Sequence, residues 1–390
     1  MAALVCAIRR YAPEMHLSIA FETKKLDSSK IEGVDYYALG SRNDSQFQSN
    51  VENCLQAANP DVIHIHGTEN ISQILPESVF RHKRVVLSLQ GIMEACAKNY
   101  LGGLEWSDLK RFENPVRRLL HRPNVQQIAS EWMKDRAPQE RVICERVRFF
   151  MGRTQFDADW IRQVNPTAHY FHVDEVLRPE FYQGRAWAAN TNKHVIYAGA
   201  AFSYPLKGGH WLLRALELVK RRYPDVELRV AASRNCVSGR LRDCVRLGEY
   251  SRYLLSLADQ LGVRENVTFL TTLTAAQVRD ELLHANVYCL SSTMENSPNS
   301  LCEAQMVGTP VVATNVGGVG DFVLNGRTGY LVPSCNPSAL ARAILMQFSA
   351  SGETALEMAD KAYDIACRRH NLTSVVGQLR VAYGVTAEGF

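Results

Sequence analysis

The hydrophobic positions of this chain form short runs rich in β-branched and aromatic residues, separated by segments of helical length. The runs lie at 16–21, 61–66, 84–89, 146–152 and 169–173, and then at 194–199, 226–232, 267–270, 286–292, 310–315 and 329–333. Apolar residues follow one another with little alternation, which predicts strands buried on both faces, as in parallel sheets covered by helices. The pattern therefore predicts an α/β protein in which this architecture occurs twice.

One segment between the two sets of strands interrupts the pattern. Residues 177–193 are polar, contain Pro179 and Gly184, and lack a clear period, so they predict the domain boundary. We expect an amino-terminal Rossmann-like domain over residues 1–180 and a carboxy-terminal Rossmann-like domain over residues 190–370.

Both ends of the chain add to this organisation. Residues 4–12 have a helical pattern that leads directly into the strand at 16–21. A doubly wound domain normally begins with a strand and a glycine-rich turn, so we expect that Met1 is an internal start and that the natural chain is longer. From residue 336 onward the pattern is helical, and the helix at 371–390 is a candidate to cross back to the amino-terminal domain.

Composition and charge narrow the class of protein. A chain of 390 residues with 46% hydrophobic and 22% charged residues is typical of a folded protein with two cores. No apolar run approaches the ~20 residues of a membrane span, and ten cysteines without a C-x-x-C pair favour reduced thiols, so we expect a cytoplasmic protein. The net charge of +4 is too balanced to predict binding to nucleic acid.

The segment from Ser291 to Ala313 is the densest candidate for chemistry. It predicts a strand, a loop, a helix, a Gly-Thr-Pro turn and a second strand. Glu295 lies in the loop, and Glu303 lies eight residues later in the helix. Ligands of open parallel sheets bind beyond the carboxyl ends of the strands, and the helix that begins near Pro298 directs its N–H groups there, which suits a phosphate.

The spacing of the two glutamates is not specific by itself. Other pairs of glutamates in this chain are also eight residues apart, and about one or two such pairs are expected by chance. The pair Glu295 and Glu303 differs from the others because a strand and a polar loop precede it and a G-T-P-V-V-A run follows it.

With this run and Gly317-Gly318, the segment resembles the signature of glycosyltransferase family 4. The similarity continues at P-D-V-I-H-I-H-G (60–67), G-R-T (152–154), Y-A-G to P-L-K-G-G (197–209) and A-N-V-Y-C-L-S-S (285–292). The resemblance implies the GT-B fold, in which two Rossmann-like doubly wound domains face a cleft. It implies metal-independent, retaining transfer of a hexose from a nucleoside diphosphate sugar, without a cofactor, to a hydroxyl of a growing glycan or lipid-linked glycan, as in cell-surface polysaccharide synthesis.

The resemblance also implies roles for individual residues. Glu303 would bind the ribose hydroxyls of the donor, Glu295 the hydroxyls of its sugar, and Lys207 the leaving diphosphate. The alternative for Lys207 is a solvated lysine at the start of a helix. The other candidates for donor binding are Gly199, Asn296, Ser297, Pro298, Asn299 and Ser300.

The chain departs from the family pattern at two positions. Ala201 stands where the family often has an arginine, so Arg153 becomes the candidate for the second cation beside the diphosphate. Gln90, followed by Gly91, stands where many relatives have a histidine, and an amide cannot act as an acid or base near neutral pH. Gln90, Gly91 and His66 are the candidates for the acceptor or donor side of the cleft.

No motif predicts a metal site. His64 and His66 alternate on one strand and share a face, but without a third ligand we interpret them as packed strand histidines. Asp157 and Asp159 have the spacing of a D-x-D pair, but we expect them at the start of a helix.

Residues 109–122 interleave basic and apolar side chains. One interpretation is an amphipathic surface that contacts anionic lipid headgroups or a lipid-diphosphate acceptor, which would place the protein at the inner face of a membrane. The other, which we prefer, is a solvated helical face broken at Pro115.

Two further hypotheses stay open at this stage. Ala201 and Gln90 favour a catalytically weak, glycosyltransferase-like protein that binds a nucleotide or serves as a scaffold. A nucleotide-sugar epimerase with the same two-domain architecture is the third hypothesis. An NAD-dependent enzyme is disfavoured because no predicted strand is followed by G-x-G-x-x-G.

Overall fold

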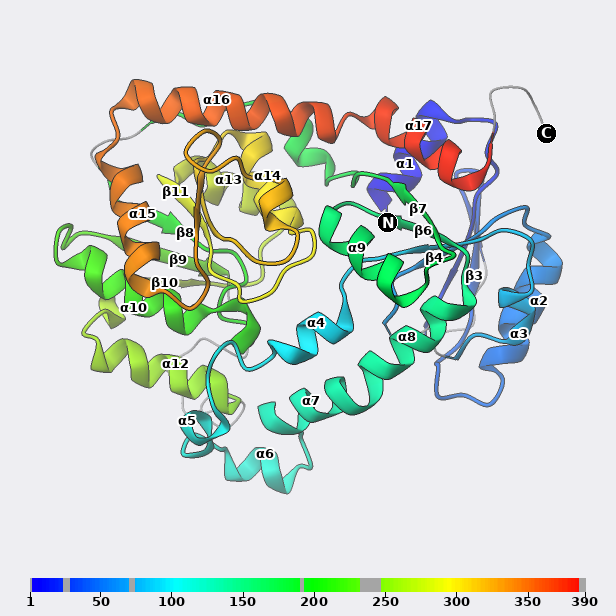
Figure 1. Ribbon diagram of the computed structural model, residues 1–390, viewed down its shortest axis with the longest axis horizontal. Helices are drawn as coiled ribbons and strands as arrows, with labels where there is room; N and C mark the ends of the chain where they lie inside the picture. The colour runs from blue at the N-terminus through cyan, green and yellow to red at the C-terminus, as the bar shows by residue number, and fades with distance from the viewer. Residues whose placement is uncertain (1, 24–28, 70–73, 190–192, 232–246, 386–390) are drawn as a thin grey trace. The chain divides into compact units, whose positions relative to one another are not determined.

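The computed structural model describes residues 2–23, 29–69, 74–189, 193–231 and 247–385. The chain forms two compact units (Figure 1). Unit 1 comprises Met1–Glu94, Asp135–Val176 and Arg369–Phe390, and unit 2 comprises Ala95–Lys134 and Leu177–Arg368. The chain therefore passes from one unit to the other four times. The strand pattern alone does not indicate that Ala95–Lys134, which lies between two strands of unit 1, packs with unit 2.

The core of unit 2 is a six-stranded sheet in which all neighbouring strands are parallel. The strands are β8 (Val195–Tyr197), β9 (Glu227–Ala231), β10 (Val267–Leu270), β11 (Val287–Leu290), β12 (Val311–Thr314) and β13 (Tyr330–Val332). Their order, β10-β9-β8-β11-β12-β13, corresponds to 3-2-1-4-5-6 when the strands are counted along the unit. This is the doubly wound order, and its switch point lies between β8 and β11. All six strands confirm the sequence prediction.

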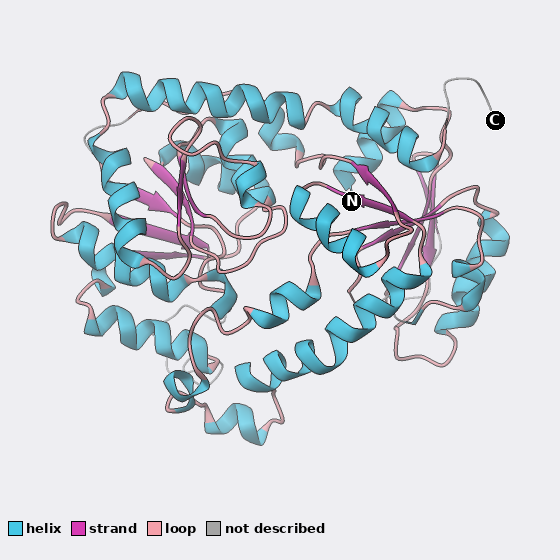
Figure 2. Ribbon diagram, in the orientation of Figure 1, coloured by secondary structure: helices cyan, strands magenta, loops and turns pink. Residues whose placement is uncertain are grey.

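Helices cover both faces of this sheet (Figure 2). They are α10 (Gly209–Lys220), α12 (Glu249–Gln260), α13 (Ala275–His284), α14 (Asn299–Val307), α15 (Pro337–Ser349) and α16 (Gly352–Arg369). On β11, Val287 and Cys289 pack into the core shared by α10, α12 and α15, whereas Tyr288 and Leu290 pack into the core shared by α13, α14 and α16. This alternation explains why the strand sequences are apolar throughout.

The segment Ala95–Lys134 is helical. It belongs to unit 2, although strands of unit 1 precede and follow it in the sequence. It contains α5 (Trp106–Lys110), α6 (Pro115–Leu119) and α7 (Val125–Glu131), and a π-helical turn at Trp132–Arg136 follows. Its apolar side chains, among them Tyr100, Leu109 and Val125, are buried in the core of α10 and α12. Hydrophobic burial thus assigns this segment to unit 2.

Unit 1 contains two sheets. The strands are β1 (Ser18–Phe21), β2 (Ser29–Ile31), β3 (Val34–Ala38), β4 (Ile63–His66), β5 (Val85–Ser88), β6 (Phe149–Gly152) and β7 (His169–His172). The parallel sheet has the order β4-β5-β6-β7, and the smaller sheet has the order β1-β3-β2, with β2 antiparallel. Five of these strands confirm the prediction. The pattern does not indicate β2, whose three residues are all exposed, or β3, whose apolar run is interrupted by Asp35.

In the sheet of unit 2, the first strand, β8, pairs with β9 on one side and with β11 on the other. Unit 1 has no such central first strand among its described residues. There, β1 pairs only with β3, and β4 pairs only with β5. Instead α1 (Ala2–Tyr11) leads into β1, as the helical pattern predicts. The longer natural chain stays a prediction.

The helices of unit 1 surround its parallel sheet. They are α1, α2 (Phe47–Ala58), α3 (Glu77–Phe80), α8 (Ala137–Arg146), α9 (Gln155–Val164) and α17 (Leu372–Tyr383), while α4 (Met93–Lys98) begins in unit 1 and ends in unit 2. Ile8 of α1 and Leu379 of α17 share an apolar core with Val86 and Met151 of the sheet. Among the helices described, none has both the length and the apolar character needed to span a bilayer.

Replacing Leu379 by alanine should lower the free energy of unfolding by about 2–5 kcal/mol, because this buried side chain would leave a cavity under α17. Urea unfolding followed by circular dichroism measures the loss. Val381→Ala on the same helix is the control, since Val381 is 63% exposed and should change stability by less than about 0.5 kcal/mol. Equal effects of the two variants would contradict the packing of α17.

Candidate functional site

Two loops extend from the carboxyl ends of β8 and β11, at the switch point of the unit 2 sheet. The loop after β8 ends in a 3₁₀ turn, Pro205–Lys207, and the loop after β11 leads into α14. The N–H of Thr293 donates a hydrogen bond to the carbonyl oxygen of Leu206 (2.8 Å), and the hydroxyl of Ser291 donates to the carbonyl oxygen of Lys207 (3.0 Å). These bonds join the two loops that carry Lys207 and Glu295.

Two glycines allow a close approach of the backbone around the second loop. A Cβ atom on Gly208 would lie 1.9 Å from the carbonyl oxygen of Ser291, and a Cβ atom on Gly317 would lie 1.9 Å from that of Glu295. Both glycines also have positive φ angles, 70° and 52°, which residues with side chains rarely adopt. The N–H of Gly318 donates to the carbonyl oxygen of Glu295 (3.1 Å). The backbone from Ser291 to Glu295 is thereby held on two sides.

Lys207 and Glu295 form an ion pair in this site. The Lys207 Nζ atom donates to Glu295 Oε1 at 2.5 Å, and the hydroxyl of Ser292 donates to the same oxygen at 2.6 Å. The two charged side chains are only 23% and 11% exposed. Burial is the largest single influence and lowers the pKa of Lys207, but the carboxylate of Glu295 and the neighbouring Tyr204 together raise it above the ordinary value. The site thus holds an ammonium group and a carboxylate at the place where a doubly wound sheet binds its ligand.

Glu303 lies on α14, one helical turn beyond Ser300. Its side chain is 7% exposed, and its two oxygens accept hydrogen bonds from Arg178 Nε and Nη2, each at 2.7 Å. Burial raises the pKa of Glu303, and the guanidinium of Arg178 limits the rise. Nothing in the sequence indicates Arg178 as a site residue, because an arginine before a proline in a polar boundary segment carries no signal of its distant partner.

The other predicted donor-binding residues surround the same switch point. Asn296 and Pro298 are buried, and Ser297 is half-buried. Asn299 is exposed at the first position of α14. The hydroxyl of Ser300 accepts a hydrogen bond from the hydroxyl of Tyr288 (2.7 Å).

The loop after β8 carries the other predicted positions. Gly199 has a φ of 33°, and Ala201 is buried, with its N–H donating to the carbonyl oxygen of Ala198. The structure therefore gathers the predicted residues of the carboxy-terminal half within unit 2.

Three predicted residues of unit 1 line one small pocket at the carboxyl ends of its parallel strands. They are His66, Gln90 and Arg153. Arg153 Nη2 donates to Gln90 Oε1 (2.8 Å) and is paired with Glu175, a partner that the sequence did not indicate. Gly91 is not among the residues that line the pocket, and its backbone N–H is bound by the carboxylate of Glu69.

Of the two histidines that line this pocket, His64 is packed as the sequence predicts, whereas His66 is exposed at the end of β4. The rings of His64 and His66 lie 3.7 Å apart between centroids, so the two residues share a face of β4. His64 is hydrogen-bonded through Nε2 to Ser88 (2.5 Å) and through Nδ1 to Tyr383 (2.7 Å). Burial lowers the pKa of His64 well below its ordinary value. Within the part of the chain that the structure describes, no three His, Cys, Asp or Glu residues are grouped to hold a metal ion.

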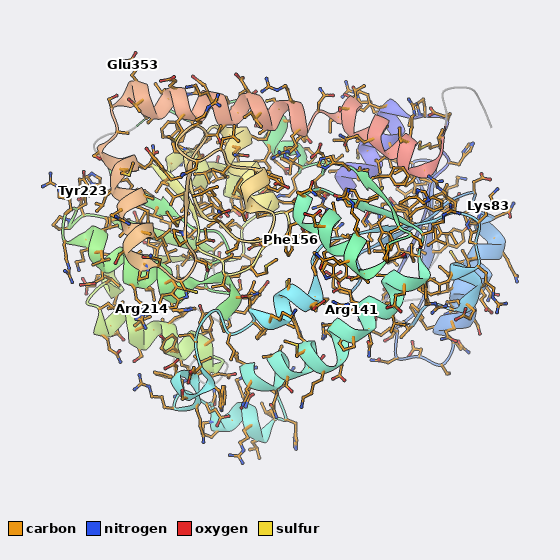
Figure 3. All side chains as sticks on the ribbon, in the orientation of Figure 1. Lys83, Arg141, Phe156, Arg214, Tyr223 and Glu353 are labelled. Carbon is orange, nitrogen blue, oxygen red and sulfur yellow. The ribbon has the colours of Figure 1, made fainter. Side chains whose placement is uncertain are left out.

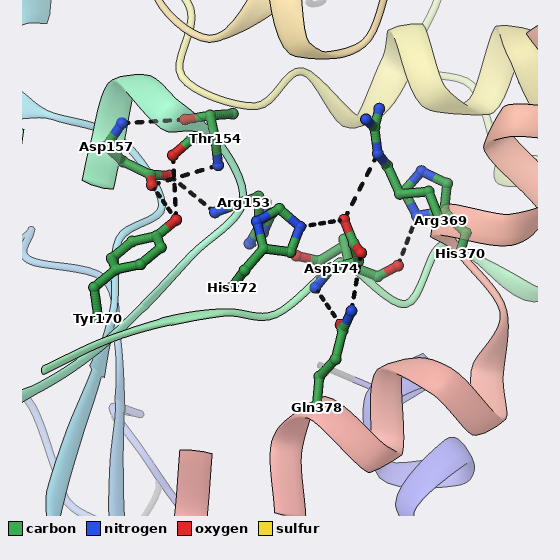
Figure 4. Close-up of polar contacts among 10 residues, drawn as sticks. Arg153, Thr154, Asp157, Tyr170, His172, Asp174, Arg369, His370 and Gln378 are labelled. Atoms are coloured by element: carbon green, nitrogen blue, oxygen red, sulfur yellow. Dashed lines mark hydrogen bonds and ion pairs between the residues drawn. The ribbon is translucent and has the colours of Figure 1, made fainter. Parts of the chain in front are cut away.

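Asp157 stabilises the start of α9, which confirms its predicted place (Figure 4). Its carboxylate accepts hydrogen bonds from the backbone N–H of Arg153 (3.0 Å) and from the hydroxyl of Tyr170 (2.6 Å). Thr154 and Asp157 form a capping box, in which each side chain accepts a backbone N–H of the other. Asp159 is exposed and bonds to neighbours on its own helix.

A buried acid that the sequence did not indicate holds the turn after β5. Glu140 of α8 is 0% exposed and accepts hydrogen bonds from the hydroxyl of Thr68 (2.5 Å) and the N–H of Glu94 (3.2 Å). The next residue, Arg141 (labelled in Figure 3), donates to the carboxylate of Glu94 (2.6 Å). Burial raises the pKa of Glu140 to about 7. Glu140 thus fixes one end of the turn that begins at Gln90.

Parts of this chain are similar to known glycosyltransferases, and its fold is similar to that of solved ones. Residues 183–364 match the family described as Glycosyl transferases group 1. The D-inositol 3-phosphate glycosyltransferase of Corynebacterium urealyticum is 34% identical over 163 residues, 42% of this chain and 37% of that protein. Sucrose-phosphate synthase from Thermosynechococcus elongatus has a TM-score of 0.72 at 15% identity, with 98% of this chain and 91% of that chain covered. Anabaena HepE, solved with UDP, has a TM-score of 0.64 at 15% identity, with 99% and 97% covered.

The chain therefore has the GT-B fold of two α/β units with parallel sheets. The residues that match the family Glycosyl transferases group 1, 183–364, lie within unit 2. The chain spans 34% to 43% of the lengths of the first three curated relatives, and these three alignments cover 39% to 44% of this chain.

Gly208→Ala should destabilise the protein more than Gly262→Ala does. Both glycines have a positive φ, 70° and 64°, which costs a residue with a side chain about 1–2 kcal/mol. A Cβ atom at 262 meets nothing within 4 Å, whereas one at 208 meets the carbonyl oxygen of Ser291. Denaturant unfolding of both variants measures the difference, and equal losses would show that the two loops do not need this close approach.

Glu140→Gln should change how stability depends on pH. Between its ordinary pKa of 4.5 and its folded value of about 7, Glu140 keeps a proton in the folded protein that the unfolded chain has released. The free energy of unfolding of the wild type therefore falls as the pH rises through this window. Because glutamine does not titrate, the free energy of unfolding of Glu140→Gln relative to that of the wild type should rise by on the order of 1–3 kcal/mol over the same window.

Thermal unfolding from about pH 5 to about pH 8 tests this difference. Glu145→Gln, an exposed position on the same helix, controls for the loss of one negative charge. A constant difference between Glu140→Gln and the wild type across the range would contradict the burial of an acid at this position.

Proposed function

We propose that this protein is a retaining, family 4 type glycosyltransferase that transfers a hexose from a nucleoside diphosphate sugar to a hydroxyl of a growing glycan or lipid-linked glycan. The observation that carries the proposal is the pairing of Lys207 with Glu295 at the switch point of unit 2, with Glu303 on the helix that follows. HepE supports it, because that protein shares the fold and was solved with UDP and with UDP-glucose.

The charges of this site match the groups of such a donor. Lys207 supplies a positive charge for the diphosphate, and Glu295 supplies acceptor oxygens for hydroxyls of the sugar. Glu303 binds the ribose hydroxyls. A carboxylate has about four acceptor sites, so the two hydrogen bonds from Arg178 leave two for hydroxyl groups.

The proposed reaction needs no metal ion. The bond between the anomeric carbon and the diphosphate breaks, and negative charge grows on the diphosphate beside Lys207, which stabilises it. The acceptor hydroxyl attacks the anomeric carbon from the face that the diphosphate leaves, and a diphosphate oxygen takes its proton. The new glycosidic bond then has the configuration of the donor.

A scaffold that binds a nucleotide without turnover is the second candidate. Gln90 favours it, since an amide bound to Arg153 stands where many relatives of family 4 have a histidine. Calorimetry with nucleotide sugars, followed by assays for hydrolysis and transfer, separates the two functions. Binding without either reaction would favour the scaffold. Within the described ranges of the chain, no feature of the geometry favours the epimerase.

Glu303→Ala should weaken binding of a nucleoside diphosphate by about 10- to 100-fold, because the ribose hydroxyls lose a charged acceptor. Isothermal titration with UDP, ADP and GDP measures the affinity, and the best of these identifies the base. Glu303→Gln keeps one acceptor oxygen and should lose less. Glu353→Ala, at an exposed position of α16, is the control. Unchanged affinity and unchanged transfer in Glu303→Ala would contradict this role of Glu303.

A further inference from the structure

The short helix α6 of unit 2 exposes apolar side chains, and it lies beside α5 in Figure 1. Leu119 is 77% exposed, Leu120 is 64% exposed, and Val116 is 37% exposed. Glu113 is the only acidic residue of the stretch 109–122. Its basic residues are Lys110, Arg111, Arg117, Arg118 and Arg122. Residues 115–122 form a surface, here named the α6 tip, that combines apolar side chains with positive charge.

The α6 tip has a defined backbone. The side chain of Asn114 accepts a hydrogen bond from the N–H of Val116 (3.1 Å) and so caps the start of the helix. His121 ends the helix in the left-handed conformation, with a φ of 50°. The N–H of Arg122 then bonds to the carbonyl oxygen of Arg117 (2.9 Å), as in a Schellman motif. The exposed leucines Leu119 and Leu120 are therefore part of a helix end with a defined, hydrogen-bonded backbone.

Residues 112–114, which directly precede the α6 tip, are fixed to α12 and to the segment just before it. Arg252 donates from Nη1 to the carbonyl oxygens of Phe112 (3.2 Å) and Glu113 (2.9 Å). The rings of Phe112 and Tyr253 pack edge to face, 5.6 Å apart. Asn114 adds a hydrogen bond from its side-chain amide to the carbonyl oxygen of Leu247 (3.1 Å).

The carboxy-terminal end of the α6 tip is fixed as well. Val125 is buried, and its N–H donates to the carboxylate of Glu249 at the start of α12. Leu109, on the other side of the tip, is also buried in the core of unit 2. The apolar residues of 109–122 are therefore divided: Leu109 and Phe112 pack inward, whereas Leu119 and Leu120 are held outward.

We propose that the α6 tip binds the surface of an anionic lipid bilayer. The guanidinium groups would lie among the lipid phosphates, and the two leucines would enter the boundary between headgroups and acyl chains. The phosphates of a nucleic acid would give the leucines no apolar contact. A stable protein interface uses about 20–30 residues on each side, whereas the α6 tip consists of the eight residues 115–122. A single site of this kind predicts weak and reversible binding.

Flotation of the protein with vesicles tests the proposal and does not depend on any transfer reaction. The vesicles are phosphatidylcholine, alone or with about one-third phosphatidylglycerol, in about 0.1 M salt. The protein should float roughly tenfold more with the anionic vesicles than with the neutral ones. Arg118→Glu with Arg122→Glu should lower binding roughly tenfold or more, and Leu119→Ser with Leu120→Ser should do the same.

Matched variants elsewhere in unit 2 complete the experiment. Leu324→Ser with Met346→Ser removes two other exposed apolar side chains, and Arg222→Glu reverses an exposed charge on a different surface. These controls should bind as the wild type does. Equal flotation with neutral vesicles, no flotation, or unchanged flotation of the leucine variant would each overturn the proposal. In the last case the arginines alone would bind, and an acidic protein or another polyanion would fit this surface better than a bilayer.

Discussion

The close approach of backbone segments around Ser291–Glu295 is the constraint on which the candidate site depends. Gly208 and Gly317 contact this segment from two sides at distances that leave no space for a Cβ atom. This contact sets the position of Glu295 relative to Lys207, because Gly208 directly follows the lysine and directly precedes α10. The doubly wound sheet supplies the place, since β8 and β11 are neighbours at its switch point.

The charged groups of both units follow a second constraint, that a charge removed from water needs a partner. Lys207 is paired with Glu295, Arg178 with Glu303, and Arg153 with Glu175. In the proposed function, a donor would replace the contact between Lys207 and Glu295 by contacts with its diphosphate and sugar hydroxyls, while Glu303 would keep Arg178 and bind the ribose hydroxyls at its remaining acceptor sites. The pairs would then keep the binding groups oriented before the donor arrives, which lowers the cost of ordering them on binding.

The sequence was sufficient for the strands of both main sheets and for the loop that carries Glu295. Buried parallel strands are apolar on both faces, so they stand out from their surroundings, and Gly-Thr-Pro before β12 marks the end of a helix. The exposed strand β2 and the interrupted strand β3 lack this signal. The segment Ala95–Lys134 has ordinary amphipathic helices, and nothing in their pattern tells which core they cover.

What the sequence determined by itself is local: the alternation of strands and helices, the Gly-Thr-Pro turn before β12, and the residue types at the ends of the strands. The tertiary structure decided which distant groups meet. Arg178 is 125 residues from Glu303, and Thr68 is 72 residues from Glu140. It also decided that Leu109 is buried while Leu119 is exposed. Local pattern follows from the period of each element, whereas these pairings follow from the packing of several elements at once, which no single segment encodes.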